Sequence, residues 1–283
     1  MSNNDVIIEV QRLGHTYPNG TKALNGIDLQ IRRGEFLGVI GQNGAGKTTL
    51  VKHFNGLLKP TEGRVVVKGI DTRAAQVSRL ARHVGYVFQN PDHQIFASKV
   101  REEIAFGPKN IGMDRAAIEK NVEEAIDVLN LREVVDIHPF RLSRGQRQRL
   151  AIAGVLAMRP EIFMLDEPTG GQDREQVLRL REVLQQLNDA GHTIILITHD
   201  MELLAESTRR AIVVRGGRVI LDGPPAEVFK HTEELRRTFL TPPQVSRLSM
   251  ELGFSRPAMS VDEAAAELLK RAESRRPRVE AQG

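Results

Sequence analysis

Residues 41–48, GQNGAGKT, constrain the fold of this chain more than any other stretch of the sequence. They match the pattern G-x-x-x-x-G-K-[ST], and they directly follow a continuous apolar run at residues 36–40. Such a short run is typical of a strand that is buried on both faces of a sheet. Because a helical pattern begins at about Lys47, the segment predicts a strand, a phosphate-binding loop and a helix, in that order.

The residue types of this loop favour binding of nucleotide phosphates. Glycines let the backbone curl tightly, so that consecutive N–H groups point at phosphate oxygens, and the helix N-terminus that follows favours negative charge. We expect Lys47 to reach the β- and γ-phosphates of ATP and the Thr48 hydroxyl to bind Mg²⁺. A chance glycine-rich turn is the alternative, but such a turn would not be expected to have both a buried strand before it and a helix after it. The predicted binding residues of this segment are Gly41, Gln42, Asn43, Gly44, Ala45, Gly46, Lys47, Thr48 and Thr49.

Apolar, strand-like runs alternate with helical patterns along most of the chain. This alternation predicts an α/β fold with a largely parallel sheet, here a P-loop nucleoside-triphosphatase core. Helices are expected near residues 114–135 and from residue 143 to a stop at Pro160, and a hairpin is expected around Gly216 and Gly217. The other predicted strands cover residues 6–17, 64–69, 83–89, 162–168 and 193–200.

Polar residues stand at the carboxyl ends of several predicted strands. Asp166 and Glu167 follow an apolar run, where one carboxylate can hold Mg²⁺ beside the phosphate loop and the next can polarise a water molecule. His199 and Gln89 end two further apolar runs. Because ligands bind at the carboxyl ends of strands in a doubly wound sheet, His199 is a candidate γ-phosphate contact and Gln89 a candidate Mg²⁺ ligand or water-positioning residue. An ordinary hydrogen-bonded strand end is the alternative for each.

Composition excludes several classes of protein. Lys and Arg number 40 against 36 Asp and Glu, and the resulting net charge of +4 is too mild to favour nucleic acid as a partner. The chain has no cysteine, which excludes disulfides and cysteine-ligated metals. No apolar run approaches the ~20 residues of a transmembrane helix, and the first residues lack a signal-peptide pattern. We therefore expect membrane association only through a partner.

The chain divides into a large domain and a small C-terminal part. We predict that residues 1–234 form the nucleotide-binding domain, with a helical subdomain at about residues 90–160. Residues 235–283 are expected to form a helical appendage that ends in a frayed tail. Within this appendage, Ser260 and Glu263 form a predicted capping box before an amphipathic helix.

The motifs together resemble those of the ATP-binding cassette (ABC) ATPases, and the resemblance covers roughly residues 6–230. The order matches: an aromatic residue near the start, the phosphate loop, Gln89, a signature segment at 142–146, the two acids and the histidine. The resemblance implies that Tyr17 stacks on adenine, that Glu167 is the catalytic base, and that His199 links this base to the γ-phosphate.

A second set of implied roles concerns partners. The resemblance implies that Ser143, Gly145 and Gln146 contact the γ-phosphate of ATP bound to the opposite subunit. It also implies that Asp173 lies in a loop that crosses between subunits and that Gln89 reports the nucleotide state to a membrane partner. Because the chain has one phosphate loop and one signature, we expect a head-to-tail dimer, homo- or heteromeric, with ATP between the two chains.

Residues 89–110 and the start of the appendage are similar to the ATPases of energy-coupling factor (ECF) transporters, which import vitamins and metal ions such as cobalt or nickel. This similarity implies a transmembrane coupling subunit, a substrate-binding membrane subunit and a peripheral location at the cytoplasmic face of the cell membrane. Ile95 and Phe96 are then candidates for an apolar groove that receives an arginine-bearing helix of the coupling subunit, with ordinary core as the alternative.

Three other interpretations stay open at this point. The chain is alternatively the ATPase of a conventional ABC transporter, a soluble cassette protein that acts on nucleic acid or ribosomes, or a nucleotide-binding regulatory subunit with little turnover. Soluble cassette proteins usually carry two cassettes or a long coiled-coil insertion, and this chain has neither. The presence of Glu167 and His199 disfavours the regulatory subunit.

The signature segment departs from the usual Leu-Ser-Gly-Gly-Gln because Arg144 replaces its first glycine, and Gln172 stands where a leucine usually precedes Asp173. Ser143 and Gln146 form a predicted capping box, so a helix begins here. Arginine in a first turn opposes the helix dipole by about 0.3–1 kcal/mol, which suits a helix that points at the phosphate of a neighbouring ATP. Solvent exposure of Arg144 is the alternative. Since the start of a right-handed helix does not need glycine, we expect the close backbone approach at Gly145.

Overall fold

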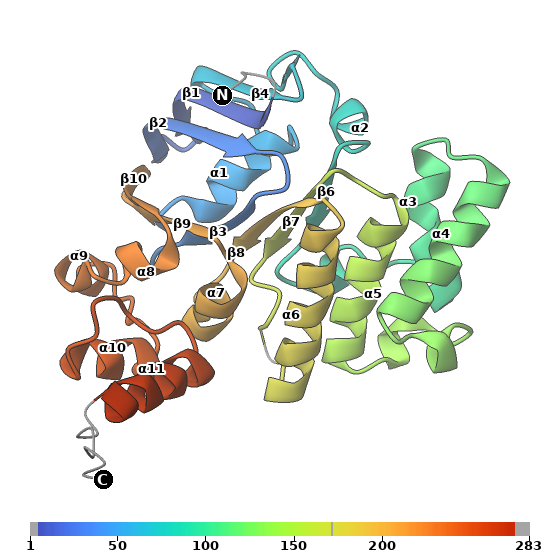
Figure 1. Ribbon diagram of the computed structural model, residues 1–283. Coiled ribbons are helices and arrows are strands. Elements are labelled where there is room, and N and C mark those ends of the chain that lie inside the picture. Colours follow the sequence, from blue (N-terminus) through green and yellow to red (C-terminus); the bar gives the residue numbers. More distant parts are fainter. Residues whose placement is uncertain (1–4, 171, 275–283) are drawn as a thin grey trace, which may run out of the picture.

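A six-stranded sheet forms the centre of the molecule (Figure 1). The computed structural model describes residues 5–170 and 172–274. The strand order is β10-β9-β3-β8-β7-β6, and every neighbouring pair is parallel except the hairpin of β9 and β10. The strands are β3 (Phe36–Ile40), β6 (Val84–Val87), β7 (Ile162–Asp166), β8 (Thr193–Ile197), β9 (Arg210–Arg215) and β10 (Arg218–Gly223).

Burial explains why these runs form central strands. All residues of β3, β7 and β8 are buried, as expected of continuous apolar runs in a parallel sheet. The turn between β9 and β10 lies at Gly216 and Gly217, whose φ angles of 54° and 72° suit glycine. The predicted α/β fold with a largely parallel sheet is thus confirmed.

A separate antiparallel sheet has the order β2-β1-β4-β5. The sequence predicted the segments of β1 and β4, but not β2 and not a second sheet. The helix α1 (Lys47–Phe54) lies between the two sheets, because its Leu50, Val51 and Phe54 share one buried cluster with residues of both. The strands of this sheet are β1 (Val6–Thr16), β2 (Lys22–Arg32), β4 (Glu62–Val67) and β5 (Ile70–Asp71).

Three helices, α3 (Val100–Asn110), α4 (Arg115–Val128) and α5 (Arg144–Ala157), pack together beyond the β6 edge of the central sheet (Figure 1). The helix predicted over residues 114–135 was too long, because α4 ends at Val128 and a separate 3-10 turn covers Arg132–Val134. Asn130 has a φ angle of 51°, the left-handed conformation that commonly terminates a helix.

The strand predicted at residues 83–89 is also shorter than expected. β6 ends at Val87, because the next backbone N–H, that of Phe88, donates to the side-chain oxygen of Gln94 at 2.9 Å rather than to a neighbouring strand. Gln89 therefore lies in the loop beyond the strand and does not end it.

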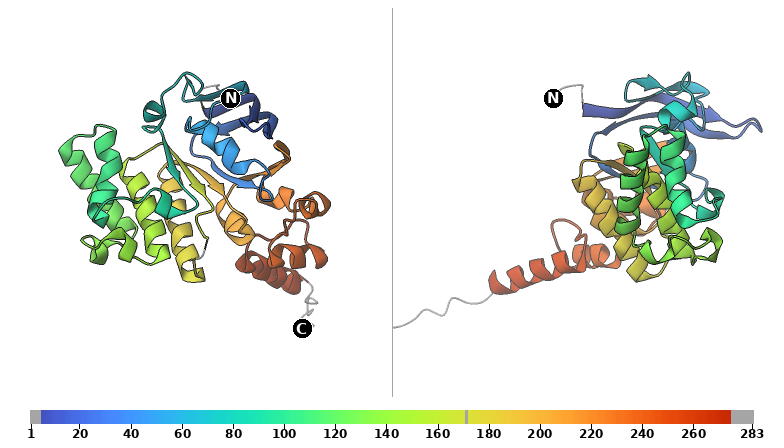
Figure 2. Two further views of the ribbon diagram at one scale, coloured as in Figure 1. Left: turned by 180° about the vertical axis from the view of Figure 1, so that it is seen from behind. Right: turned by 90° about the vertical axis from the view of Figure 1, so that its right-hand side faces the viewer.

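The C-terminal part of the chain contains two longer helices, α10 (Gln244–Glu251) and α11 (Val261–Ser274), and α11 projects away from the rest (Figure 2). Only half of the predicted capping box forms: Ser260 accepts from the N–H of Glu263, but the Glu263 carboxylate accepts from Met259. The frayed tail falls outside the described residues, and the domain boundaries stay predictions. The remaining helices are α2 (Val77–Leu80), α6 (Arg174–Asp189), α7 (Met201–Ser207), α8 (Pro225–Val228) and α9 (Thr232–Arg236).

In the part of the chain that the structure describes, no helix combines the length and the apolar character that crossing a membrane requires.

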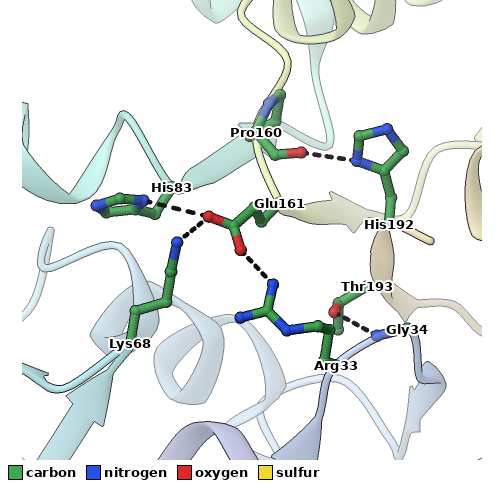
Figure 3. A network of polar contacts seen from close by, with 8 residues as sticks. All are labelled: Arg33, Gly34, Lys68, His83, Pro160, Glu161, His192 and Thr193. Carbon is green, nitrogen blue, oxygen red and sulfur yellow. Dashed lines mark hydrogen bonds and ion pairs between the residues drawn. The ribbon is translucent and has the colours of Figure 1, made fainter. Parts of the chain in front are cut away.

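A charged cluster around Glu161 joins the two sheets at the amino end of β7 (Figure 3). The Glu161 carboxylate pairs with Arg33, which follows β2, and with Lys68, which follows β4. Its third neighbour is His83, at 3.8 Å, whose pKa is lowered by burial and by the cations Lys68, Arg79 and Arg82. This cluster links segments that follow β2 and β4 to the start of β7, at the end of β7 that is remote from Asp166.

We predict that Gly85→Ala destabilises the fold. A Cβ at Gly85 would lie 2.3 Å from Val155 Cγ1 and 2.9 Å from the ring of Pro160, and neither a β-branched side chain nor a proline ring can move aside. We expect the free energy of unfolding in urea to fall by about 1–3 kcal/mol. Gly223→Ala is the matched control, because its Cβ would meet nothing within 4 Å; equal stability of the two variants would contradict the packing described.

Candidate nucleotide-binding site

The phosphate loop connects β3 to α1 and is held between the two sheets. A Cβ at Gly41 would lie 2.2 Å from the carbonyl oxygen of Val214, and a Cβ at Gly46 would lie 2.8 Å from that of Ala23. Both glycines have positive φ angles, 153° and 108°, so a side chain is excluded by space and by conformation. The N–H of Gly217 donates to the carbonyl of Ala45 at 3.0 Å, which ties the loop to the β9–β10 turn.

The Lys47 side chain curls back over this loop. Its ammonium donates to the carbonyl oxygens of Gly41 at 2.7 Å and Gln42 at 3.1 Å. Burial lowers the pKa of Lys47, and the nearby carboxylates of Glu167 and Asp166 oppose this shift. The arrangement thus places one buried cation at the phosphate loop, where its charge can attract a polyanion, with two carboxylates nearby.

Asp166 ends β7 beside the first turn of α1. The Thr48 hydroxyl donates to Asp166 Oδ2 at 2.8 Å, so the structure brings the two predicted Mg²⁺ ligands together. The hydroxyl of Tyr86, on the neighbouring strand β6, donates to the same oxygen at 2.9 Å. Sequence reasoning missed Tyr86, although alternation along β6 puts it on one face of the sheet with the residue at position 84.

The donor set at Asp166 and Thr48 fits Mg²⁺, which prefers oxygen ligands and is usually held by one or two carboxylates together with substrate phosphates. The described residues contain no group of three or more His, Cys, Asp or Glu side chains that could hold a metal alone. Mg²⁺ bound here with ATP would neutralise charge on the β- and γ-phosphates. Gln89, the third predicted ligand, is exposed, and the described residues give its side chain no hydrogen-bond partner.

Glu167 and His199 form a close pair next to Asp166. His199 Nδ1 lies 2.6 Å from Glu167 Oε2, and the backbone N–H of His199 donates to the same oxygen at 3.2 Å. Burial raises the pKa of Glu167, while His199 and Lys47 act against this shift. The His199 side chain is 71% exposed, whereas that of Glu167 is 9% exposed. The pair therefore offers a buried carboxylate whose orientation is set by a histidine that faces outward.

Tyr17 lies close to the amino end of α1, where its hydroxyl is 3.0 Å from Thr49 Oγ1. Its ring meets that of His15 edge-on at 4.7 Å, and His15 Nδ1 lies 3.2 Å from Nε2 of His53. Burial lowers the pKa of His53 to about 4, so this imidazole is neutral at ordinary pH. Sequence reasoning missed this histidine pair, of which His15 packs against the predicted adenine-stacking residue.

The signature residues lie at the start of α5. Ser143 and Gln146 form the predicted capping box, with bonds of 3.2 and 2.9 Å. Asp173 caps α6 by accepting from the N–H of Gln176 at 2.9 Å, and a Cβ at Gly145 would lie 2.3 Å from Oε1 of the same Gln176. The two helix starts are therefore neighbours.

The signature residues and the phosphate loop do not meet within one chain. Among the described residues, no hydrogen bond joins residues 143–146 to residues 41–48. The phosphate loop leads into α1, which lies between the two sheets, whereas the signature residues begin α5, which lies among the outer helices (Figure 1). The candidate residues thus form two separate surfaces on one chain.

These features define a P-loop nucleotide-binding protein. They are a buried strand, a glycine loop closed by a lysine, a helix, and an aspartate at a strand end that meets the Thr48 hydroxyl. Residues 24–170 match the family model described as ABC transporter. A putative ABC transporter ATP-binding protein of Caldanaerobacter subterraneus is 48% identical over 252 residues, which cover 89% of this chain and 44% of the relative. The energy-coupling factor transporter ATP-binding protein EcfA of Methanocaldococcus jannaschii is 42% identical over 86% of this chain and 88% of its own length.

Two solved structures are similar as well. The structure of cbiO1 from Clostridium perfringens, described as part of the ABC transporter complex cbiONQ, has a TM-score of 0.75 and 36% identity, over 88% of this chain and all of the other. The ATP-binding cassette MJ0796, solved as a dimer in a post-hydrolysis state with ADP and Pi, has a TM-score of 0.71 and 28% identity, over 77% of this chain and 98% of the other. This chain belongs to the ABC transporter ATPase family. It spans less than half the length of the first curated relatives that it matches.

We predict that Gly145→Leu abolishes ATP turnover while Arg144→Gly retains it. A side chain at Gly145 would meet only the flexible end of Gln176, so the fold should tolerate it, but leucine would cover the backbone at the start of α5 that is proposed to approach the γ-phosphate. Arg144, in contrast, is exposed. Turnover by Gly145→Leu should fall at least ~100-fold, the size of effect seen when one transition-state contact is lost. The measurement is phosphate release at saturating ATP, and comparable rates for Gly145→Leu and the natural chain would contradict the assignment.

Proposed function

We propose that this chain is the ATP-hydrolysing subunit of an ECF-type importer, which couples ATP binding and hydrolysis to uptake of a vitamin or transition-metal ion through membrane partners. The observation that carries the hydrolytic part is the buried Glu167–His199 pair beside the phosphate loop, at 2.6 Å. The importer part is supported by the name of the EcfA relative, by the cbiO1 structure and by the groove described below. The chain would work as a peripheral protein at the cytoplasmic face of the membrane.

The proposed reaction is ATP + H₂O → ADP + phosphate. Backbone N–H groups of the loop and Lys47 hold the β- and γ-phosphates, Tyr17 stacks on adenine, and Thr48 with Asp166 holds Mg²⁺. A water oxygen forms the new bond to the γ-phosphorus, and the bond from that phosphorus to the bridging oxygen breaks. Glu167 accepts a proton of this water as general base, and His199 keeps the Glu167 carboxylate in place.

We predict that Glu167→Gln slows ATP hydrolysis by roughly 10²–10⁴-fold, because an amide cannot accept the proton of the attacking water. Binding of ATP should change little, since the phosphate loop and Asp166 are untouched, so the variant should accumulate as an ATP-bound dimer. The rate is followed by phosphate release and the dimer by light scattering after gel filtration. Wild-type turnover in this variant would overturn the assignment of the base.

The separation of the two surfaces supports a composite site. Ser143, Gly145 and Gln146 of a second chain, with Asp173 in the neighbouring loop, would complete the ATP site of the first. The MJ0796 cassette has been solved as a dimer with ADP and Pi, and a head-to-tail dimer of this chain would place each signature over the ATP of its neighbour. The second chain is either another copy or a related ATPase.

A groove of about 530 Å³ on the helical side of the domain is the proposed docking site for the transmembrane coupling subunit. Phe96, which is 59% exposed, meets Phe106 edge-on at 4.3 Å in its wall. Ile95 is buried in the core, so for this residue the core interpretation holds. The lining residues are Ser78, Arg79, Ala81, Arg82, Gln94, Phe96, Glu103, Phe106, Gly107, Asn110, Ile111, Gly154, Val155 and Met158.

Glu103 is the one acidic residue among those that line this groove, and Arg79 and Arg82 line it as well. Its carboxylate is buried and accepts from the N–H groups of Phe96 at 2.9 Å and Ala97 at 2.7 Å. No Lys, Arg or His of residues 5–170 and 172–274 forms an ion pair with it. The lining thus carries charges of both signs, so the apolar wall formed by Phe96 and Phe106 is the feature that supports a docking site here.

We predict that Phe96→Glu weakens association with the coupling subunit at least ~10-fold, because it replaces the exposed aromatic contact of the groove with a charged side chain. The measurement is co-purification of the membrane subunit from detergent extracts of the native membrane. Phe239→Glu is the matched control, since Phe239 is 85% exposed outside the groove. Equal recovery with both variants would place the docking site elsewhere, and isolation with ribosomes or DNA in place of a membrane subunit would overturn the proposed function.

A further inference from the structure

Tyr86 lies beside the nucleotide site, and the roles proposed above leave it unused. It stands on β6 opposite Met164 of β7, two residues before Asp166. Side chains at positions i and i+2 of a strand share a face, so Tyr86 lies on the same face of the sheet as Asp166. Its long side chain reaches along the strand direction, and its hydroxyl donates to Asp166 Oδ2 at 2.9 Å.

Asp166 is thereby held by two donors on one oxygen. Thr48 donates to Oδ2 at 2.8 Å from α1, and Tyr86 donates to it from the opposite strand. In the described part of the chain, Oδ1 accepts no side-chain hydrogen bond. If the Thr48 hydroxyl turns to a cation, the Tyr86 hydroxyl is the remaining side-chain donor that keeps the carboxylate in its orientation. Outer partners of this kind orient ligating carboxylates in metal sites.

The ring of Tyr86 is itself fixed. Phe88 packs against it with ring centroids 4.7 Å apart. The N–H of Phe88 donates to Gln94 at 2.9 Å, and the Gln94 amide donates to the carbonyl of Ala151 in α5 at 3.3 Å. The hydroxyl is thus aimed by a packed ring and by contacts that extend to the helical part of the domain. For core packing alone, a phenylalanine would serve equally well, so the hydroxyl needs a separate explanation.

We propose that Tyr86 is a positioning residue that holds the Asp166 carboxylate for a divalent cation and so sets how much this cation strengthens nucleotide binding. The proposal rests on the proposed function, because it takes Asp166 as the metal ligand of the ATP site. Tyr86 touches neither nucleotide nor metal in this account and acts only through Asp166.

The test uses Tyr86→Phe in the full chain and the non-hydrolysable nucleotide AMP-PNP. The dissociation constant is measured by calorimetry once in EDTA and once in saturating Mg²⁺, and the ratio of the two constants reports the coupling of metal to nucleotide. In Tyr86→Phe we expect the dissociation constant in EDTA to stay unchanged and the constant in Mg²⁺ to rise. The ratio of the constant in EDTA to the constant in Mg²⁺ should therefore fall about 10-fold, the lower end for loss of an outer partner of a metal ligand. An unchanged ratio, or equal weakening with and without Mg²⁺, would overturn the proposal.

A double-mutant cycle with Asp166→Asn separates positioning from a general structural role. If Tyr86 acts through Asp166, then Tyr86→Phe changes the ratio of constants in the natural chain but not in the Asp166→Asn variant. Equal, additive changes in both backgrounds would contradict the proposal. Failure of the proposed function gives a different result, because the natural chain would then not bind AMP-PNP in either EDTA or Mg²⁺.

Discussion

The conformation of the phosphate loop requires glycine at two positions where the backbone lies directly against a carbonyl group and leaves no room for a side chain. Gly41 lies against the carbonyl of Val214 in the central sheet, and Gly46 lies against the carbonyl of Ala23 in the antiparallel sheet. The loop is therefore one of the places where the two sheets are joined. A side chain at either position would clash with a backbone carbonyl of one of the sheets, so the geometry of the site and the packing of the domain depend on the same contacts.

The charges of the site depend on each other in the same way. Lys47, Asp166 and Glu167 are all buried, and a buried charge without a partner is costly. Each carboxylate opposes the lowering of the Lys47 pKa that burial causes, and His199 opposes the raising of the Glu167 pKa. The structure stabilises these groups mainly through one another and through backbone dipoles, which suits a site that a polyphosphate and a divalent cation enter together.

The sequence alone was enough to predict the site residues that stand at strand ends, because the carboxyl ends of parallel strands lie together at one edge of a sheet. The phosphate loop, Asp166, Glu167 and His199 stand at the carboxyl ends of β3, β7 and β8, and the structure brings them together. The capping box of Ser143 and Gln146 followed from local chemistry and is present. Their functional roles stay proposals.

Other features were beyond sequence reasoning because they depend on which strands are neighbours. Tyr86 reaches Asp166 only because β6 pairs with β7 in a particular register. The pair of His15 and His53 forms between a strand and a helix that are 38 residues apart. The end of β6 depended on a side-chain acceptor from Gln94. The strand β2, in contrast, was within reach of sequence reasoning, because Ile27, Leu29 and Ile31 alternate with polar residues.

The central claim is that two chains share each ATP site. The most direct test mixes two inactive variants, Lys47→Ala, which lacks the phosphate-loop lysine, and Gly145→Leu, which lacks a working signature. In a mixed dimer, one site carries both defects and the other carries none, so mixing should restore ATP turnover that neither variant has alone. If differently tagged copies of the two variants co-purify as a dimer and the mixture still hydrolyses no ATP, the composite site is contradicted.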